Sequence, residues 1–245
     1  MPQSAPAAIA RDDHAFAAWA AEQAGARLLA VRAEGLEGKE LKDAGDAAAQ
    51  DVLARLLAEH RPGDSVLSEE AADDKTRLSA DRVWIIDPLD GTREFSEPPR
   101  DDWAVHVALW EGGELVAGAV SQPALGETFG TGTPPVVVPR TSERPRIAVS
   151  RTRPPAFVEA LAAEIHAELV PMGSAGVKVM SVVRDVSDAY VHAGGQYQWD
   201  NAAPVVVARA AGLHCSRVDG SPLVYNADDT SLPDLVVCRP ELAES

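Results

Sequence analysis

The feature that most constrains the fold of this chain is a short apolar run that ends in two aspartates and a Gly-Thr pair. Residues 83–95 read Val-Trp-Ile-Ile-Asp-Pro-Leu-Asp-Gly-Thr-Arg-Glu-Phe. The first four residues are typical of a buried strand, so we expect Asp87 and Asp90 where that strand stops. Gly91 and Thr92 would then open the next segment with free N–H groups, which suit a phosphate. Two carboxylates beside them suit a hard cation. The simpler alternative is an acidic turn after a strand.

The overall charge of the chain limits its partners. The 245 residues are 46% hydrophobic and 24% charged, which is ordinary for one large globular domain or two small fused ones. The net charge of −16 argues against a nucleic-acid polymer or an anionic membrane surface as partner. It would also repel a phosphate substrate, and bound divalent cations would solve that problem locally.

Two further features bear on the compartment. Cys215 and Cys238 form no metal motif and are too few for a disulfide scaffold. The N-terminus lacks the basic start and apolar stretch of an export signal, and no apolar run is long enough to span a bilayer. We therefore expect a cytoplasmic protein that does not bind a membrane.

The pattern divides the chain into two halves. In residues 1–140 we predict a first helix capped by Asp12 or Asp13 and a second helix capped by Asp46. Alternating apolar residues and turn signals over 103–129 predict an antiparallel meander. This α+β half carries most of the candidate metal ligands.

Residues 141–245 have a different character and are expected to complete the site. A segment rich in Pro, Thr and Arg over 131–145 predicts a hinge between the halves. The alternation of strand and helix signals after it favours a layered α/β unit. The predicted strands are 146–150, 169–172, 188–193, 213–218 and 235–238, and the predicted helices are 155–166, 174–183 and 200–211.

Three more acidic residues are candidates for the same site. Glu69 leaves the predicted strand 66–68 for a loop, as Asp87 leaves its own strand. Asp200 follows Trp199 at the start of a predicted helix, and Asp46 also precedes one. On local grounds alone, a plain helix cap is the better interpretation of both Asp46 and Asp200.

Four separated motifs, in the same order, resemble those of the inositol-monophosphatase-like phosphatases, which are magnesium-dependent and lithium-sensitive. The resemblance covers nearly the whole chain, from the first helix to Pro240. It implies an α/β fold of the layered αβαβα sandwich type, with the site between the halves. The motifs are Lys42-Asp43-Ala44-Gly45-Asp46, Ser68-Glu69-Glu70, Asp87-Pro88-Leu89-Asp90-Gly91-Thr92 and Trp199-Asp200, and Gly173-Ser174-Ala175 matches a further segment.

The resemblance also implies roles for single residues and a site with two to three Mg²⁺ ions. Asp46 and Thr92 would orient and deprotonate the attacking water. The implied metal ligands are Glu69, Asp87, Asp90, Asp200 and the carbonyl of Leu89. The implied substrate contacts are Asp90, Gly91, Thr92, Gly173, Ser174, Lys178 and Asp200.

Within this superfamily the chain resembles the CysQ-type 3′(2′),5′-bisphosphate nucleotidases, above all the actinobacterial group. Inositol phosphatases usually carry Asn and then Phe after Gly-Thr-x, whereas this chain has Arg93-Glu94-Phe95, and Ala193 stands where they carry an acidic residue. The implied reaction converts 3′-phosphoadenosine 5′-phosphate, a by-product of sulfate assimilation, to AMP and phosphate, with the 5′-phosphosulfate as a second substrate. Inositol 1-phosphate and fructose 1,6-bisphosphate are the alternative or additional substrates.

Several smaller questions stay open at this point. Lys178 either pairs with the second phosphate of the substrate or is a solvated helix lysine. Tyr197 and Trp199 could stack on adenine, although Trp199 also suits a core position. His106 and His192 have no second ligand at metal spacing, so we interpret both as structural. Relatives are commonly dimers, so the resemblance is compatible with a homodimer.

Two other classes of protein compete with this interpretation. Haloacid-dehalogenase-like phosphatases also place aspartates at a strand end, but with one residue between them, whereas Pro88 and Leu89 stand here. A non-catalytic regulator on the same scaffold would often lose a ligand or the water activator, and this chain keeps all of them. The loop over residues 71–81 could serve as a flap over the metals.

Overall fold

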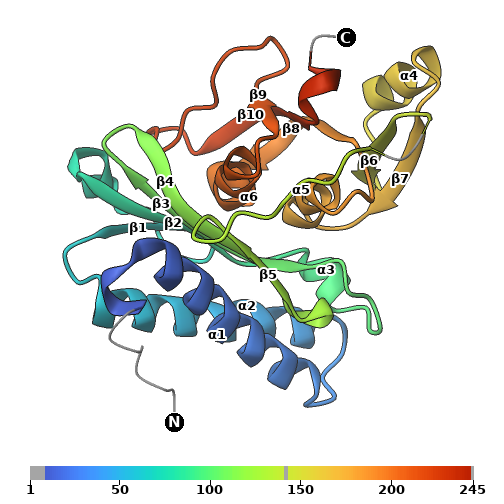
Figure 1. The fold of residues 1–245 in the computed structure, drawn as a ribbon. Coiled ribbons are helices and arrows are strands. Elements are labelled where there is room, and N and C mark those ends of the chain that lie inside the picture. Colours follow the sequence, from blue (N-terminus) through green and yellow to red (C-terminus); the bar gives the residue numbers. More distant parts are fainter. Residues whose placement is uncertain (1–8, 141–142, 244–245) are drawn as a thin grey trace.

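The protein consists of five alternating layers of helices and sheets (Figure 1). The computed structural model describes residues 9–140 and 143–243. Two helices cover the outer face of a first sheet, two helices lie between the sheets, and one helix covers part of the second sheet. The predicted αβαβα sandwich is confirmed.

The outer helical layer holds α1 (Asp13–Arg32) and α2 (Gly38–His60), preceded by η1 (Ile9–Arg11). Asp12 caps α1 as predicted, because its side chain accepts the backbone N–H of His14 at 2.9 Å. The predicted cap of α2 at Asp46 is wrong, since the helix begins eight residues earlier and Asp46 lies inside it.

Gly45 lies inside α2, although the sequence around it resembles a loop, and it allows close packing. A Cβ at Gly45 would lie 2.6 Å from Phe95 and 3.0 Å from Leu89. Glycine therefore lets α2 approach the turn after β2 closely, although it costs helix propensity. That close approach brings Asp46 to the site from the middle of a helix.

The first sheet has the order β1-β2-β3-β4-β5, in which β1 and β2 are parallel and the remaining pairs form the predicted antiparallel meander. Contrary to expectation, β2 does not stop at Asp87 but continues through an irregularity to Asp90. The strands are β1 (Ser65–Ser68), β2 (Arg82–Asp90), β3 (Ala104–Glu111), β4 (Glu114–Gln122) and β5 (Glu127–Gly130). Short helices join them: η2 (Lys75–Ser79), α3 (Thr92–Phe95) and η3 (Pro123–Leu125).

The second sheet has the order β7-β6-β8-β10-β9, with β6 parallel to both β7 and β8. Its strands are β6 (Arg146–Ser150), β7 (Glu168–Met172), β8 (Ala189–Tyr197), β9 (His214–Ser216) and β10 (Ser231–Cys238). Between the sheets lie α5 (Ala175–Val183) and α6 (Gln198–Ala210), and α4 (Ala156–Glu164) and η4 (Pro240–Leu242) lie outside.

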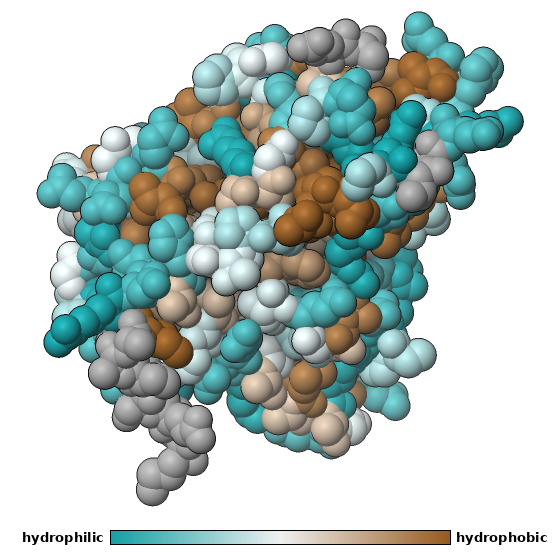
Figure 2. All heavy atoms as spheres, viewed as in Figure 1, coloured by the Kyte–Doolittle hydropathy of each residue, from teal (hydrophilic) through white to brown (hydrophobic). Residues whose placement is uncertain are grey.

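Besides a small cluster around Ile147 and Val158 at α4, two large hydrophobic cores fill the spaces between the layers. One joins α1 and α2 to the first sheet around Phe16, Trp84 and Trp103, and the larger one surrounds α5 and α6 between the two sheets. The outermost helix is less covered, and Figure 2 shows apolar side chains over α4, where Phe157 and Ile165 are 42% and 44% exposed. Among the described helices, none combines the length and the apolar character needed to cross a bilayer.

Candidate functional site

The predicted acidic ligands come from neighbouring strand ends and from one helix start. Asp87 and Asp90 lie on the last residues of β2. The parallel neighbour β1 pairs Ser68 with Ile86, and the N–H of Glu69 donates to the carbonyl of Ile86 at 3.4 Å. The pairing therefore brings Glu69 beside Asp87, as the common edge of two parallel strands requires.

Asp200 reaches the cluster from the middle layer. It is the third residue of α6, and its carboxylate accepts the backbone N–H of Tyr197 at 2.5 Å. Tyr197, and not Asp200, is the N-cap residue, but the carboxylate of Asp200 caps the helix from its third position as part of a capping box. A carboxylate in the first turn is favoured by the partial positive charge of the helix N-terminus.

The charges of these four residues act on one another. Burial, and then the charges of Glu69 and Asp90, raise the pKa of Asp87 well above its ordinary value. Burial and then Asp90 raise the pKa of Asp200 to about 8. The outer side of Glu69 is exposed, yet partial burial, Asp90 and Glu70 raise its pKa to about 7. Carboxylates that raise one another's pKa in this way form a site that calls for a cation.

The predicted water activators, Asp46 and Thr92, also lie side by side. The hydroxyl oxygen of Thr92 is 3.4 Å from Oδ1 of Asp46 and 3.1 Å from the carbonyl oxygen of Leu89. Burial, and then the charge of Glu70, raise the pKa of Asp46 to about 6, against the Thr92 hydrogen bond. Asp46, together with Asp43 and Glu70, borders an open hollow of about 410 Å³, so solvent reaches this carboxylate.

The turn after β2 leaves one oxygen of Asp87 without a hydrogen-bond partner. The N–H of Leu89 donates to Oδ1 of Asp87 at 3.0 Å. Within the described part of the chain, Oδ2 of Asp87 is buried and accepts no hydrogen bond. An unpartnered buried carboxylate oxygen is costly, so this atom is suited to a ligand that the chain itself does not supply.

Gly91 is required by the conformation of the same turn. Its φ of 87° is a left-handed conformation that favours glycine. A Cβ there would lie 3.2 Å from each of three neighbouring atoms, including Cβ of Ser174. The turn is therefore pressed against the loop that precedes α5, and α3 begins at the next residue, Thr92.

The loop before α5 holds one oxygen of Asp90 from the opposite half of the molecule. Oδ2 of Asp90 accepts the hydroxyl of Ser174 at 2.5 Å and the N–H of Gly176 at 2.7 Å. Ser174 is buried, and its hydroxyl also accepts the N–H of Val177 at 3.0 Å. In this structure Ser174 thus orients Asp90.

Lys178 supports that loop from inside. Its side chain is buried, and Nζ donates to the carbonyl of Ser174 at 2.6 Å and to that of Gly173 at 3.3 Å. The alternative of a solvated helix lysine is therefore wrong. Burial lowers the pKa of Lys178, and the negative charge of Asp90 opposes that shift.

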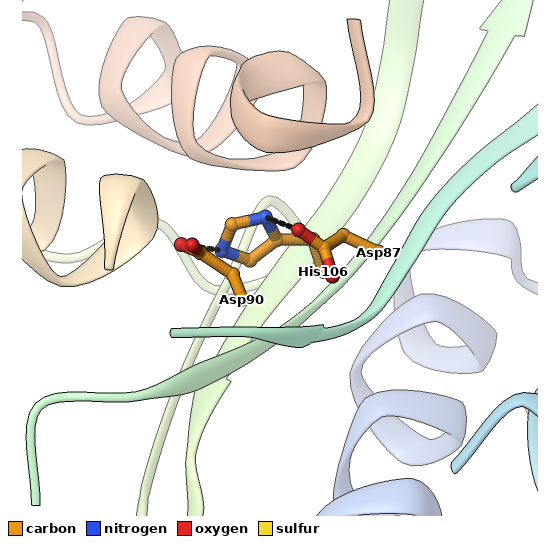
Figure 3. A group of neighbouring side chains, drawn as sticks. All are labelled: Asp87, Asp90 and His106. Carbon is orange, nitrogen blue, oxygen red and sulfur yellow. Dashed lines mark ion pairs between the residues drawn. The ribbon is translucent and has the colours of Figure 1, made fainter. Parts of the chain in front are cut away.

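His106 belongs to the site, and the sequence analysis missed this. In Figure 3 its ring lies between the two aspartates of β2. Nε2 is 3.3 Å from Oδ2 of Asp90, and Nδ1 is 3.9 Å from Oδ2 of Asp87 and 3.3 Å from the carbonyl oxygen of Trp199. One ligand atom from each of His106, Asp87 and Asp90 lies within 4.8 Å of the others, a spacing suited to a metal.

The register of the first hairpin was the missing signal. β3 pairs antiparallel with β2 so that His106 stands opposite Asp87. The sequence predicted that hairpin but not its register, and spacing along the chain cannot reveal a pair of residues 19 positions apart. His192 lies on β8 instead, where Nε2 is 2.6 Å from the carbonyl oxygen of Gly194.

The loop that follows Glu69, which the sequence suggested as a flap, is anchored through Arg77. Arg77 is fully buried and donates to Oδ1 of Asn226 at 2.7 Å and to the carbonyl of Ala227 at 3.0 Å. It also forms an ion pair with Asp73 at 2.7 Å. These bonds tie the loop of the first half to the segment before β10.

Comparison with known proteins gives a consistent picture. The model of the inositol monophosphatase family matches residues 10–235. The chain is 53% identical over 233 residues to the 3′-phosphoadenosine 5′-phosphate phosphatase of Mycobacterium bovis, covering 90% of this chain and 86% of that protein. It is 30% identical over 200 residues to the 3′(2′),5′-bisphosphate nucleotidase CysQ of Escherichia coli, covering 77% and 81%.

A solved structure extends the likeness to three dimensions. The crystal structure of CysQ from Bacteroides thetaiotaomicron matches with a TM-score of 0.78 and 25% identity, covering 91% of this chain and 96% of that chain. The match runs through both sheets, so the acidic cluster and the loop before α5 lie within the shared fold.

Proposed function

The chain belongs to the inositol monophosphatase family, and we propose that within it the protein hydrolyses 3′-phosphoadenosine 5′-phosphate to AMP and phosphate. One observation carries this proposal: Glu69, Asp87, Asp90 and Asp200 converge next to the Asp46–Thr92 pair. The 53% identity with a mycobacterial protein named for that activity supports the choice of substrate.

The residues present fit magnesium. The site offers mainly carboxylate oxygens, which are the ligands that Mg²⁺ prefers, and Oδ2 of Asp87 has no hydrogen-bond partner among the described residues. We propose Glu69, Asp87, Asp90, Asp200 and the carbonyl of Leu89 as ligands for two to three Mg²⁺ ions. When bound, magnesium supplies charge neutralisation to the phosphate and lowers the pKa of the attacking water.

The chain's own groups would orient the reactants. Asp46, whose pKa is raised to about 6 by burial and by Glu70, accepts a proton readily near neutral pH. The Thr92 hydroxyl, between Asp46 and the carbonyl of Leu89, fixes the position of a water held there. The N–H groups at the start of α3, from Gly91 onward, would bind the phosphate oxygens.

His106 would orient Asp90 and would not replace it as a ligand. Its two ring nitrogens face the carbonyl oxygen of Trp199 and a carboxylate oxygen of Asp90. Nε2 forms no hydrogen bond with any described residue, so we propose that His106 supports the position of Asp90 as a packed outer contact of a metal ligand.

The experiment that tests the function compares kcat/KM for four esters. They are 3′-phosphoadenosine 5′-phosphate, its 5′-phosphosulfate analogue, inositol 1-phosphate and fructose 1,6-bisphosphate, each assayed with Mg²⁺ and again with Li⁺ added. We expect the bisphosphate nucleotide to have the highest kcat/KM and Li⁺ to inhibit the hydrolysis of every ester. A preference for inositol or fructose phosphate would reassign the substrate.

Controls separate the competing classes of protein. Asp87→Asn should lose metal binding and activity together while the protein keeps its circular-dichroism spectrum. A burst of phosphoenzyme in rapid-quench experiments would instead indicate an aspartyl nucleophile. Absence of Mg²⁺-dependent phosphate release from all four esters would indicate a non-catalytic binding protein.

A further inference from the structure

Two aromatic rings stack on each other at the edge of the acidic cluster. The ring centroids of Tyr197 and Trp199 are 4.9 Å apart, and their planes differ by 12°. Trp199 is partly buried and packs on the central core, whereas Tyr197 is 45% exposed. The inner ring therefore holds the outer ring in place, and the outer ring presents an aromatic surface to solvent.

The backbone of this stacked pair is bound to the catalytic cluster. The N–H of Tyr197 donates to the carboxylate of Asp200 at 2.5 Å. The carbonyl oxygen of Trp199 lies 3.3 Å from Nδ1 of His106. The rings consequently stand at a fixed position beside the carboxylates that would surround the phosphate.

The chain next to the exposed ring leaves space for a flat ligand. Ala193, Gly194 and Gly195 are exposed, and a Cβ built on either glycine would meet no atom within 4 Å. The segment thus combines an aromatic face with open room on the side of β8.

We propose that Tyr197, supported by Trp199, stacks on the base of the nucleotide substrate and thereby sets the preference for nucleotides over base-free phosphate esters. This inference rests on the proposed function and assigns to the aromatic pair the recognition of adenine. Stacking of a base on an aromatic side chain changes affinity by about 5- to 150-fold. It requires only a π-face, so it selects nucleotides as a class.

The test measures the ratio of kcat/KM for 3′-phosphoadenosine 5′-phosphate to kcat/KM for inositol 1-phosphate. Tyr197→Ala should lower this ratio at least about fivefold. Tyr197→Phe keeps the ring and should keep the ratio within about twofold. Because the alanine variant retains the N–H that binds Asp200, the metal cluster keeps that contact. Phe157→Ala, an exposed aromatic on α4, is the matched control.

A second readout does not depend on turnover. Binding of AMP, measured calorimetrically in the presence of Mg²⁺, should weaken in Tyr197→Ala by the same factor as the ratio and stay unchanged in Phe157→Ala. An unchanged ratio in Tyr197→Ala, whether or not kcat/KM falls equally for both esters, would overturn the role of Tyr197 while leaving the proposed function intact. A wild-type protein that does not hydrolyse the nucleotide would overturn the proposed function itself.

Discussion

His106 and Ser174, from different halves of the molecule, meet at the same oxygen of Asp90. The Ser174 hydroxyl lies 2.5 Å and Nε2 of His106 lies 3.3 Å from Oδ2, and the N–H of Gly176 also donates to it. Protein groups thus surround one carboxylate oxygen of Asp90, and we propose that its other oxygen binds a cation. The orientation of Asp90 therefore depends on residues that need not contact any metal or substrate.

We predict that His106→Ala raises the Mg²⁺ concentration needed for half-maximal activity by roughly 10- to 100-fold, as losing an outer contact of a ligand generally does. The assay is a Mg²⁺ titration at saturating substrate. His106→Asn, which keeps a polar group, should be affected less. An unchanged Mg²⁺ requirement with reduced thermal stability would mean that His106 is only a packing residue.

Gly176 offers an independent probe of the same contact. A Cβ at this position would lie 2.0 Å from Nε2 of His106, so Gly176→Ala should displace the ring. In a double-mutant cycle, Gly176→Ala should lower the free energy of unfolding much less in a His106→Ala background than in the wild-type protein. We expect a coupling of about 1–3 kcal/mol in the free energy of unfolding. Additive effects would contradict direct contact between the two positions.

The raised carboxyl pKa values predict how stability depends on pH without metal. The folded state binds more protons than the unfolded chain at every pH between the ordinary carboxyl pKa of about 4 and the raised values. These values are about 7 for Glu69 and about 8 for Asp200. The free energy of unfolding of the metal-free protein should therefore fall as the pH rises to about 8.

Thermal unfolding between about pH 6.5 and pH 8.5 is the suitable measurement. Burial lowers the pKa of His106 and His192, so these histidines make the free energy of unfolding rise with pH, but only below about pH 6.5. Saturating Mg²⁺ should abolish the decline, since the cation replaces the protons. Asp200→Asn, which cannot titrate, should reduce the slope in EDTA. A stability that rises over this range in EDTA would refute the prediction.

Thr92 should matter for turnover more than for binding. Thr92→Val removes the hydroxyl that lies between Asp46 and the Leu89 carbonyl but keeps the shape. We expect kcat to fall roughly 100-fold or more, as for the loss of a proton-transfer group, with KM changed only a few-fold. Thr92→Ser keeps the hydroxyl and serves as control. A rise in KM at constant kcat would assign Thr92 to substrate binding alone.

Gly45→Ala should destabilise the protein even though alanine favours helices. The gain in helix propensity is about 1 kcal/mol, but the new methyl group would overlap Phe95 and Leu89. Overpacking of this kind costs about 1–3 kcal/mol, so we expect a lower urea midpoint and reduced activity. Gly63→Ala, whose Cβ would meet no atom within 4 Å, is the matched control. Stabilisation by Gly45→Ala would contradict the packing argument.

The sequence was sufficient for the layers and for the meeting of the first acidic residues, although β2 runs on to Asp90. Glu69, Asp87 and Asp90 follow apolar β-runs, and neighbouring strand ends share an edge, so their meeting is a local consequence of the pattern. The position of Asp46 is not local. It depends on the approach of α2 to Phe95, which the sequence signals only through a glycine that resembles a loop residue.

The contact of His106 with the site and the bond from Ser174 to Asp90 lay beyond the reach of sequence reasoning for a related reason. The position of His106 depends on strand register, and that of Ser174 on the packing of α5 against the first sheet. Neither leaves a periodicity or spacing that can be read along one chain. Lys178 illustrates the same limit, because the sequence could not show that its amine bonds to backbone carbonyls inside the protein.

The bond from Asp90 across the layers to the start of α5 restricts how such a protein can be recombined. A chimera that takes residues up to the middle of the chain from one relative and the remainder from another would pair an Asp90 with a foreign Ser174–Gly176 loop. Functional hybrids should therefore arise where that loop keeps its backbone conformation. A crossover that changes this conformation should yield a folded but inactive protein.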